Sequence, residues 1–118
     1  MAKILNFKTH SDSRGCLTVI EKTIPFEIKR IFYIYDVDDS KRGLHKHKRT
    51  RQLAVCIKGS CDIVIEKIKK KTYRLDRPEI GLIIEPEDFH WMENFSKDSI
   101  LLILASEFYN ENDYVYEN

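Results

Sequence analysis

The sequence lacks any apolar run long enough to cross a membrane, and its opening residues, MAKILNFKTH, lack an apolar signal-peptide core. It also lacks an excess of charge of one sign. Its 20 Lys and Arg residues nearly balance its 19 Asp and Glu residues, which leaves a net charge of +1. General binding to nucleic acid requires a strongly basic surface, so this balance argues against it. We therefore expect a cytoplasmic protein that binds neither membranes nor nucleic acid.

Cysteine is scarce, and no CxxC motif is present. The three cysteines, Cys16, Cys56 and Cys61, are odd in number, and each lies in an apolar or strand-like stretch. This pattern predicts free and mostly buried thiols. Free thiols are typical of a reducing compartment, which again indicates the cytoplasm.

Helical periodicity is missing as well. Short runs rich in Val, Ile, Tyr, Phe and Thr alternate instead with turn-forming residues. The runs are CLTVIE (16–21), IKRIFYIYDV (28–37), QLAVCI (52–57), CDIVIEKI (61–68), KTYRL (71–75), GLIIE (81–85) and SILLILAS (99–106). We predict one all-β domain over residues 1–118, built as a sandwich or small barrel. SILLILAS is apolar on both faces, which indicates a central strand or a subunit contact. The acidic tail, NENDYVYEN, is either an ordered edge or a frayed end.

The stretch RGLHKHKRTRQ (42–52) contains two histidines two residues apart. In an extended chain, His45 and His47 point to the same side with their Cα atoms about 6.5–7 Å apart, and Lys46 and Lys48 point to the other side. Unperturbed imidazole titrates near pH ~6.5, so each ring can take or give a proton at neutral pH. Two such rings on one wall can reach neighbouring atoms of a small substrate.

The spacing continues beyond the pair. Gln52 follows His47 after four residues, Gly59 follows after six more, and His90 and Asn94 later show the pattern His-x3-Asn. These offsets resemble the two motifs of the cupin barrels. Two departures are Gln52, where cupins carry a glutamate, and the glycine missing from Pro86-Glu87-Asp88.

Three interpretations of these histidines remain open. His45, His47 and His90 could bind a metal as three imidazoles, although the neutral Gln52 weakens such a site. Acid–base chemistry without a metal is the interpretation we favour. The third is a set of strand histidines without function. The basic residues around the pair suit a solvated face, a nucleic-acid patch or a ligand with a pyrophosphate, and few aromatic residues lie nearby for base stacking.

The order of segments along the chain is more specific than either cupin motif. SRGCLTVIE, PFEIKRIFYIYDV, RGLHKHK, QLAVCIKGS, GLIIEPEDFHWMENF and LLILASEFYNENDYV follow one another between about residues 4 and 116. In this order they resemble the sugar-nucleotide 3,4-ketoisomerases. The resemblance implies a cupin-type jelly roll that dimerises through exchanged N-terminal strands and uses no metal or other cofactor. It also implies conversion of a dTDP-linked 4-keto-6-deoxyglucose into a 3-keto-6-deoxyhexose, with a pathway aminotransferase acting downstream.

The resemblance makes His45 and His47 the catalytic pair. The reaction removes the C3 proton of the sugar, passes through an enediol(ate) and returns a proton to C4. We assign His45 as the base at C3 and His47 as the second proton-transfer or oxygen-stabilising group, and the reverse assignment stays open.

Other residues are expected to contact the substrate. Arg42 would stabilise the enediolate or bind the pyrophosphate. Tyr33 and Tyr35 are expected to face inward; Arg30 differs from them in parity, so its direction is left open. Gln52 would orient a histidine or a sugar hydroxyl through its amide.

Two positions bear on the configuration of the product at C4. Family members with Arg and His at these positions resemble galacto producers, and members with Tyr and Arg resemble gluco producers. This chain carries Arg14 and His90, which indicates dTDP-3-keto-6-deoxygalactose as the product. Trp91 is a departure from some relatives and is expected to reshape the pocket.

Two other functions stay in view: a metal-dependent cupin enzyme, and a non-catalytic cupin that binds a nucleotide sugar. An epimerase on the same substrate would use a His–Asp pair, and the sequence shows no such pair around His45.

Overall fold

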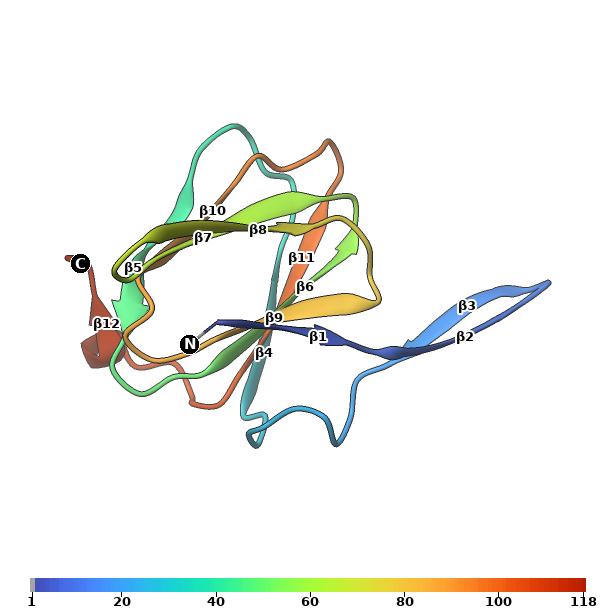
Figure 1. Ribbon diagram of the computed structural model, residues 1–118, viewed down its shortest axis with the longest axis horizontal. Helices are drawn as coiled ribbons and strands as arrows, with labels where there is room; N and C mark the ends of the chain where they lie inside the picture. Colours follow the sequence, from blue (N-terminus) through green and yellow to red (C-terminus); the bar gives the residue numbers. More distant parts are fainter. Residues whose placement is uncertain (1) are drawn as a thin grey trace.

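The computed structural model describes residues 2–118, which form a β-sandwich with a projecting hairpin (Figure 1). The strands are β1 (Lys3–Asn6), β2 (Lys8–Asp12), β3 (Gly15–Val19), β4 (Arg30–Ile34), β5 (Arg42–His47), β6 (Gln52–Lys58), β7 (Cys61–Glu66), β8 (Lys70–Leu75), β9 (Ile80–Ile84), β10 (His90–Glu93), β11 (Ile100–Ala105) and β12 (Tyr114–Val115), with one 3-10 helix, η1 (Glu111–Asp113). Each predicted run overlaps a strand, and the all-β prediction is confirmed. Within residues 2–118 no helix is long and apolar enough to span a membrane.

Two five-stranded antiparallel sheets pack face to face. The first has the strand order β1-β9-β6-β11-β4, and the second has the order β12-β5-β10-β7-β8. Hairpin β2–β3 forms a separate two-stranded sheet. The run SILLILAS becomes β11, which lies between β6 and β4, so the prediction of a central strand is confirmed.

Strand alternation divides the apolar side chains between the inside and the outside of the sandwich. Alternate residues of the two sheets meet in one core, where a fully buried aliphatic side chain contributes about 1.5–3 kcal/mol. The inward residues include Ala54, Cys56, Cys61, Ile63, Ile65, Leu75, Leu82, Ile84, Met92, Leu101 and Ile103. Cys56 and Cys61 are therefore buried, whereas Cys16 is exposed on the hairpin, and all three thiols are free.

The outer face of the first sheet is apolar too. Phe7, Leu53, Val55, Ile83 and Leu104 form a second cluster there, partly covered by apolar side chains of the segment 20–26. Farther along this face, towards β4, large apolar side chains are exposed. This sheet thus has more apolar surface than its own chain covers.

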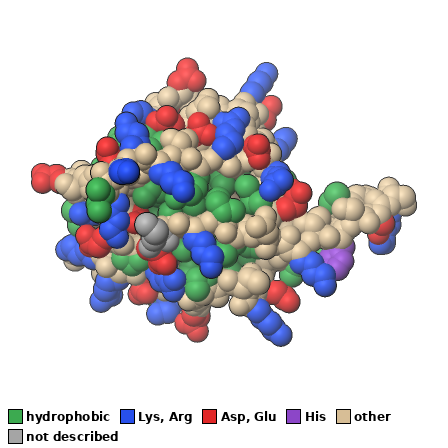
Figure 2. All heavy atoms as spheres, viewed as in Figure 1, with side chains coloured by type: hydrophobic (Ala, Val, Ile, Leu, Met, Phe, Trp, Pro, Cys, Tyr) green, Lys and Arg blue, Asp and Glu red, His purple; other side chains and the backbone are tan. Residues whose placement is uncertain are grey.

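Hairpin β2–β3 extends away from the sandwich, as both the ribbon and the space-filling view show (Figure 1, Figure 2). Its turn carries Arg14, which forms an ion pair with Asp12 at 2.7 Å. Most of its residues are exposed. The hairpin therefore gains little stability from its own subunit.

An irregularity in β5 aligns it with β10. The register between the two strands shifts next to His90, so that His90 lies opposite His45 while Trp91 lies opposite Gly43. Gly43 has φ +100°, a backbone conformation that glycine adopts readily and other residues disfavour. Leu44 follows with φ 56°. A Cβ at Gly43 would lie 3.2 Å from the backbone carbonyl oxygen of His90. Glycine is thus required at this point of β5, where a Cβ would crowd the backbone of β10.

We predict that Gly43→Ala lowers both stability and activity. The backbone strain costs about 1–3 kcal/mol, and the methyl group pushes β5 away from His90. Urea unfolding and turnover measure the two effects, with turnover falling at least ~10-fold. Gly15→Ala is the matched control, because Gly15 has φ +139° and its Cβ would meet nothing within 4 Å. An equal loss of stability in both variants would contradict the steric role of Gly43.

Candidate active site

Three histidines meet on the inner face of the second sheet. β5 contributes His45 and His47, and β10 contributes His90. The ring centroids of His45 and His47 are 4.9 Å apart, those of His45 and His90 are 4.9 Å apart, and those of His47 and His90 are 6.1 Å apart. One nitrogen from each ring lies within 4.8 Å of the others. His45 thus stands between two other imidazoles.

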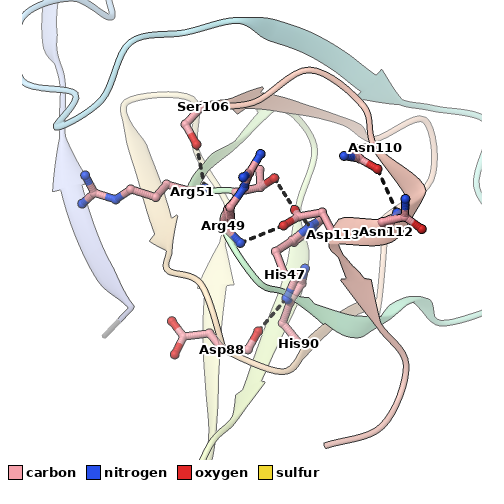
Figure 3. A network of polar contacts seen from close by, with 10 residues as sticks. His47, Arg49, Arg51, Asp88, His90, Ser106, Asn110, Asn112 and Asp113 are labelled. Atoms are coloured by element: carbon pink, nitrogen blue, oxygen red, sulfur yellow. Dashed lines mark hydrogen bonds and ion pairs between the residues drawn. The ribbon is translucent and has the colours of Figure 1, made fainter.

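Hydrogen bonds at the back of two rings fix which nitrogen faces the centre of the site. Nδ1 of His90 lies 2.9 Å from the backbone carbonyl oxygen of Asp88, which can only accept, so Nδ1 donates (Figure 3). Nδ1 of His47 lies 2.9 Å from the Asp113 carboxylate and donates in the same way. In the neutral rings the Nε2 atoms therefore carry lone pairs. Both Nε2 atoms are buried without a hydrogen-bond partner within residues 2–118.

The first sheet supplies two more polar groups from the facing wall. Gln52 shares the inward face of β6 with Ala54, and Arg30 shares the inward face of β4 with Phe32. Both residues flank Ala105 of β11 in the sheet register. Oε1 of Gln52 and Nε of Arg30 are also buried without a partner in the described chain.

This concentration of unpartnered atoms points to a ligand. The described residues contain five such buried side-chain atoms, and only the Ser99 hydroxyl comes from a residue outside this group. Buried polar atoms in folded proteins are normally satisfied, so four unpaired ones on facing walls indicate a site for a polar molecule. Two lone-pair acceptors, an amide oxygen and a guanidinium suit a hydroxylated ligand that develops negative charge.

Aromatic rings from the C-terminal segment complete the wall. The Tyr114 ring lies 4.8 Å from that of His45 and 4.5 Å from that of His47. Tyr109 is 5.8 Å from Tyr114, and the Arg30 guanidinium lies 5.6 Å from the Tyr109 ring. The chain's last residues therefore connect the two sheets at the site.

Burial keeps all three imidazoles uncharged. It lowers the pKa of His45 to about 4 and that of His90 to about 3, because an ion loses its hydration inside the sandwich. The pKa of His47 is also lowered by burial, although the Asp113 carboxylate acts against this shift. For Asp113 itself, burial favours a higher pKa, but hydrogen bonds from Thr50, Arg49 and His47 outweigh it and lower the pKa. At neutral pH the site thus holds three bases and a carboxylate.

The predicted inward direction of Tyr33, on β4, and of Tyr35, just after it, is wrong. Tyr33 and Tyr35 do not face inward, since their side chains are 62% and 59% exposed on the outer face. Phe32 and Ile34 pack against the core instead. Strand alternation places Arg30 on the same side as these two residues, so Arg30 faces inward. The apolar pair Phe32 and Ile34 sets the parity of the strand.

Arg42 is exposed, and the side chain of Trp91 packs outside the main core. Arg42 is exposed at the start of β5, so its contact with substrate stays a prediction. Trp91 does not reshape the pocket from inside, because it packs with Phe89 and Val64 in a cluster apart from the core. The amines of Lys41 and Lys70 lie 5.2 and 5.5 Å from its ring.

Part of the basic run is a paired surface. Arg51 forms a two-pronged ion pair with Glu85 at 2.6 and 2.9 Å, and the amine of Lys46 lies 3.3 Å from Glu87. Arg51 and Lys46 are therefore paired with carboxylates of their own chain. This pairing weakens the interpretation of the basic run as a nucleic-acid patch.

Asp113 is the residue that sequence reasoning missed. It lies 66 positions beyond His47, in the acidic tail, and no motif marks it. The tail proves to be an ordered edge, because β12 pairs with β5. The structure therefore contains a His–Asp pair, at His47 rather than at His45.

The three imidazoles fit the donor set of a metal site, with Gln52 where cupins supply a fourth ligand. The neutral amide adds no negative charge, which disfavours a divalent cation. A metal at this position would polarise the keto oxygen of a sugar.

Facing antiparallel sheets with histidines on the inner wall define a cupin-type sandwich with an internal cluster of histidines. The FdtA family model (WxcM-like, C-terminal) matches residues 1–118. A curated relative, the TDP-4-oxo-6-deoxy-alpha-D-glucose-3,4-oxoisomerase of Aneurinibacillus thermoaerophilus, is 44% identical over 98% of this chain and 88% of its own.

Solved structures agree. A 3,4-ketoisomerase from Helicobacter canadensis superposes with a TM-score of 0.94 and 48% identity, over 98% of this chain and 90% of its own. QdtA from Thermoanaerobacterium thermosaccharolyticum, a sugar 3,4-ketoisomerase solved with TDP, gives 0.95 and 40%, over 98% and 88%. The chain belongs to the FdtA family and is a sugar-nucleotide 3,4-ketoisomerase.

We predict that stability falls as the pH drops from 7.5 to 5.5. The buried histidines have lowered pKa values when folded, so the unfolded chain takes up their protons first, near pH ~6.5. Their contribution is complete above that pH and is lost progressively below it. Urea midpoints at several pH values measure this loss.

Two variants test the cause. His90→Gln should show a smaller drop in midpoint than the unmodified chain, because one buried histidine no longer titrates. His10→Gln alters an exposed hairpin histidine and should show the full drop. An unchanged pH dependence in His90→Gln would rule out His90 as a source of the loss.

Proposed function

We propose that this enzyme converts dTDP-4-keto-6-deoxyglucose into dTDP-3-keto-6-deoxygalactose by proton transfer among its histidines. The observation that carries this proposal is the cluster of three neutral imidazoles, in which the buried Nε2 atoms of His47 and His90 lack partners within residues 2–118. The curated relative is named for the same 4-oxo sugar, and a variant of QdtA has been solved with TDP-4-keto-6-deoxyglucose. Membership in an enzyme family argues against the alternative of a non-catalytic cupin that binds a nucleotide sugar.

The reaction moves the carbonyl by one carbon. A base takes the C3 proton, the C3–H electrons form a C3=C4 double bond, and O4 becomes negative. A proton passes from O3 to O4. The double-bond electrons then take a proton at C4 while C3=O forms, so atoms and charge balance.

His45 is the best-placed base for C3. Its ring lies 4.9 Å from each of the other two, so a proton taken by His45 can pass to either neighbour. His47 serves O3 and O4 as the second proton-transfer group. Arg30 faces inward with an unpartnered Nε, which suits the negative oxygen or the pyrophosphate, and Gln52 accepts a hydrogen bond from a sugar hydroxyl. Arg42 lies nearer solvent and is assigned to the pyrophosphate.

Arg14 and His90 support the galacto configuration. Relatives at 42% identity include both a TDP-fucose and a TDP-quinovose 3,4-ketoisomerase of Campylobacter jejuni, so overall similarity favours neither product. A QdtA variant solved with TDP replaces a tyrosine by arginine and an arginine by histidine, the residue types present here. His90 would deliver or direct the proton to one face of C4. A PLP-dependent aminotransferase would consume the 3-keto product.

A homodimer explains two exposed features. The outer face of the first sheet exposes Ile31, Tyr33 and Tyr35, and a hollow of about 650 Å³ beside these tyrosines includes Ile57 and Leu102. In addition, β4 is a free edge strand in the described chain, able to accept a strand from another subunit. Exchange of the β2–β3 hairpins would cover both features. The tyrosines would then serve the interface instead of the substrate.

The exchange also gives Arg14 a route to the site. In its own chain Arg14 lies in the turn between β2 and β3, and this hairpin projects away from the sandwich (Figure 1). If the hairpin of one subunit paired with β4 of the other, its Arg14 would lie towards Arg30, which faces the histidines. We therefore assign Arg14 to the partner's site. The free thiols suit a cytoplasmic dimer.

Product analysis tests the reaction and its stereochemistry together. NMR of the product in D2O should show a 3-keto-6-deoxygalactose with solvent deuterium at C4, because C3 has become the carbonyl carbon. His45→Asn should reduce kcat by about 10²–10⁴-fold while retaining TDP affinity. A gluco product would show that Arg14 and His90 do not direct the galacto configuration. Full turnover in His45→Asn would show that His45 is not the base.

The three-imidazole donor set keeps a metal-dependent enzyme as the second candidate. Dialysis against EDTA separates the two. Metal-free protein with unchanged kcat supports the proposal, and activity restored only by added zinc or iron supports the alternative.

Mixed dimers test the exchange. When His45→Asn and Arg14→Ala chains are co-expressed with different tags, trans assembly leaves one complete site in each heterodimer, with both mutations in the other site. An equal mixture should recover about a quarter of the wild-type galacto activity, because half of the dimers are mixed. If Arg14 acts within its own chain, no heterodimer has a complete site and activity stays at the level of the two variants. A monomer in sedimentation would also end the proposal.

A further inference from the structure

The Asp113 carboxylate is held by three donors from one short stretch of chain. Oδ1 accepts the backbone N–H of Arg49 at 2.7 Å, and Oδ2 accepts the Thr50 hydroxyl at 2.5 Å (Figure 3). Oδ2 also lies 2.9 Å from Nδ1 of His47. Asp113 and His47 are both buried, with side chains 9% and 2% exposed. The carboxylate is therefore fixed in place before substrate arrives.

The backbone of the same segment is anchored independently of this carboxylate. The carbonyl oxygen of Asp113 accepts the N–H of Lys48 at 2.9 Å, and β12 pairs Tyr114 with His47. Asn110 caps η1 by accepting the N–H of Asn112. Since these contacts already attach the C-terminal segment to β5, the buried carboxylate is not needed for that attachment alone.

We propose that Asp113 is a positioning residue that fixes the tautomer and orientation of His47, so that Nε2 presents a lone pair to the sugar. This proposal rests on the proposed function, because it concerns the same reaction. The observation that distinguishes it from simple packing is the Nε2 atom itself, which is buried, has no partner in the described part of the chain and lies on the side of the ring away from Asp113.

The fixed tautomer has a chemical purpose. In the enediolate, before C3=O forms, Nε2 of His47 accepts the O3 proton, and the ring becomes an imidazolium between the sugar and the carboxylate. The ring then returns this proton to O4, and the carboxylate remains ionised throughout. Asp113 touches no substrate atom and acts through His47 alone.

Asp113→Asn tests this through an inverted tautomer. The backbone N–H of Arg49 can donate only to the amide oxygen of asparagine, which turns the amide NH₂ towards His47 and Thr50. His47 would then accept at Nδ1 and carry its proton on Nε2, so it could no longer take one from the sugar. Ring ¹⁵N NMR distinguishes the two tautomers. We expect kcat to fall at least ~100-fold with KM and TDP affinity within about threefold.

Glu85→Gln is the matched control. It removes the ion pair to Arg51, adjacent to Thr50, without touching the Asp113 carboxylate. It should keep both the His47 tautomer and a kcat within about twofold of the unmodified enzyme. Asp113→Glu, which restores a carboxylate, should recover the Nδ1–H tautomer and part of kcat.

The outcomes separate the two proposals. An Asp113→Asn protein that keeps the Nδ1–H tautomer, or that keeps full kcat, overturns the positioning role. Equal losses in Asp113→Asn and Glu85→Gln would also overturn it, since they would reflect loosening of the chain. If the unmodified enzyme fails to isomerise the dTDP sugar, the proposed function falls, and the NMR comparison still decides the role of Asp113.

Discussion

Desolvation of three imidazoles between two apolar sheets is the constraint on which the site depends. An imidazolium in this interior would lose its hydration, and the facing rings would repel one another if more than one were charged. The rings therefore remain neutral and present lone pairs. The apolar core that stabilises the sandwich thus also keeps the histidines neutral. The stability of the fold and the protonation state of the site therefore depend on the same contacts.

Strand alternation and one irregularity turn this constraint into a geometry. Alternation directs His45 and His47 inward along β5, and it directs Arg30 and Gln52 inward from the opposite sheet. The register shift at Gly43 then aligns His45 with His90. As a result, polar atoms from both sheets face the same space, although their strands are far apart in the sequence.

Both ends of the chain contribute to this site in our view of the enzyme. The C-terminal segment places Tyr114 against two of the imidazoles and Asp113 behind His47. The N-terminal hairpin carries Arg14 away from its own sandwich, and we assign it to a partner.

The sequence by itself determined the all-β class, the strands of highest apolar content and the His45–His47 pair, because these follow from local alternation and motif spacing. It also identified the family, which the comparisons confirm. It gave the wrong direction for Tyr33 and Tyr35, since the parity of β4 is set by which side chains the opposite sheet can bury. It could not find Asp113, because a hydrogen bond across 66 residues has no local signature. Only the tertiary structure decided which polar atoms are buried together, as burial depends on the packing of both sheets at once.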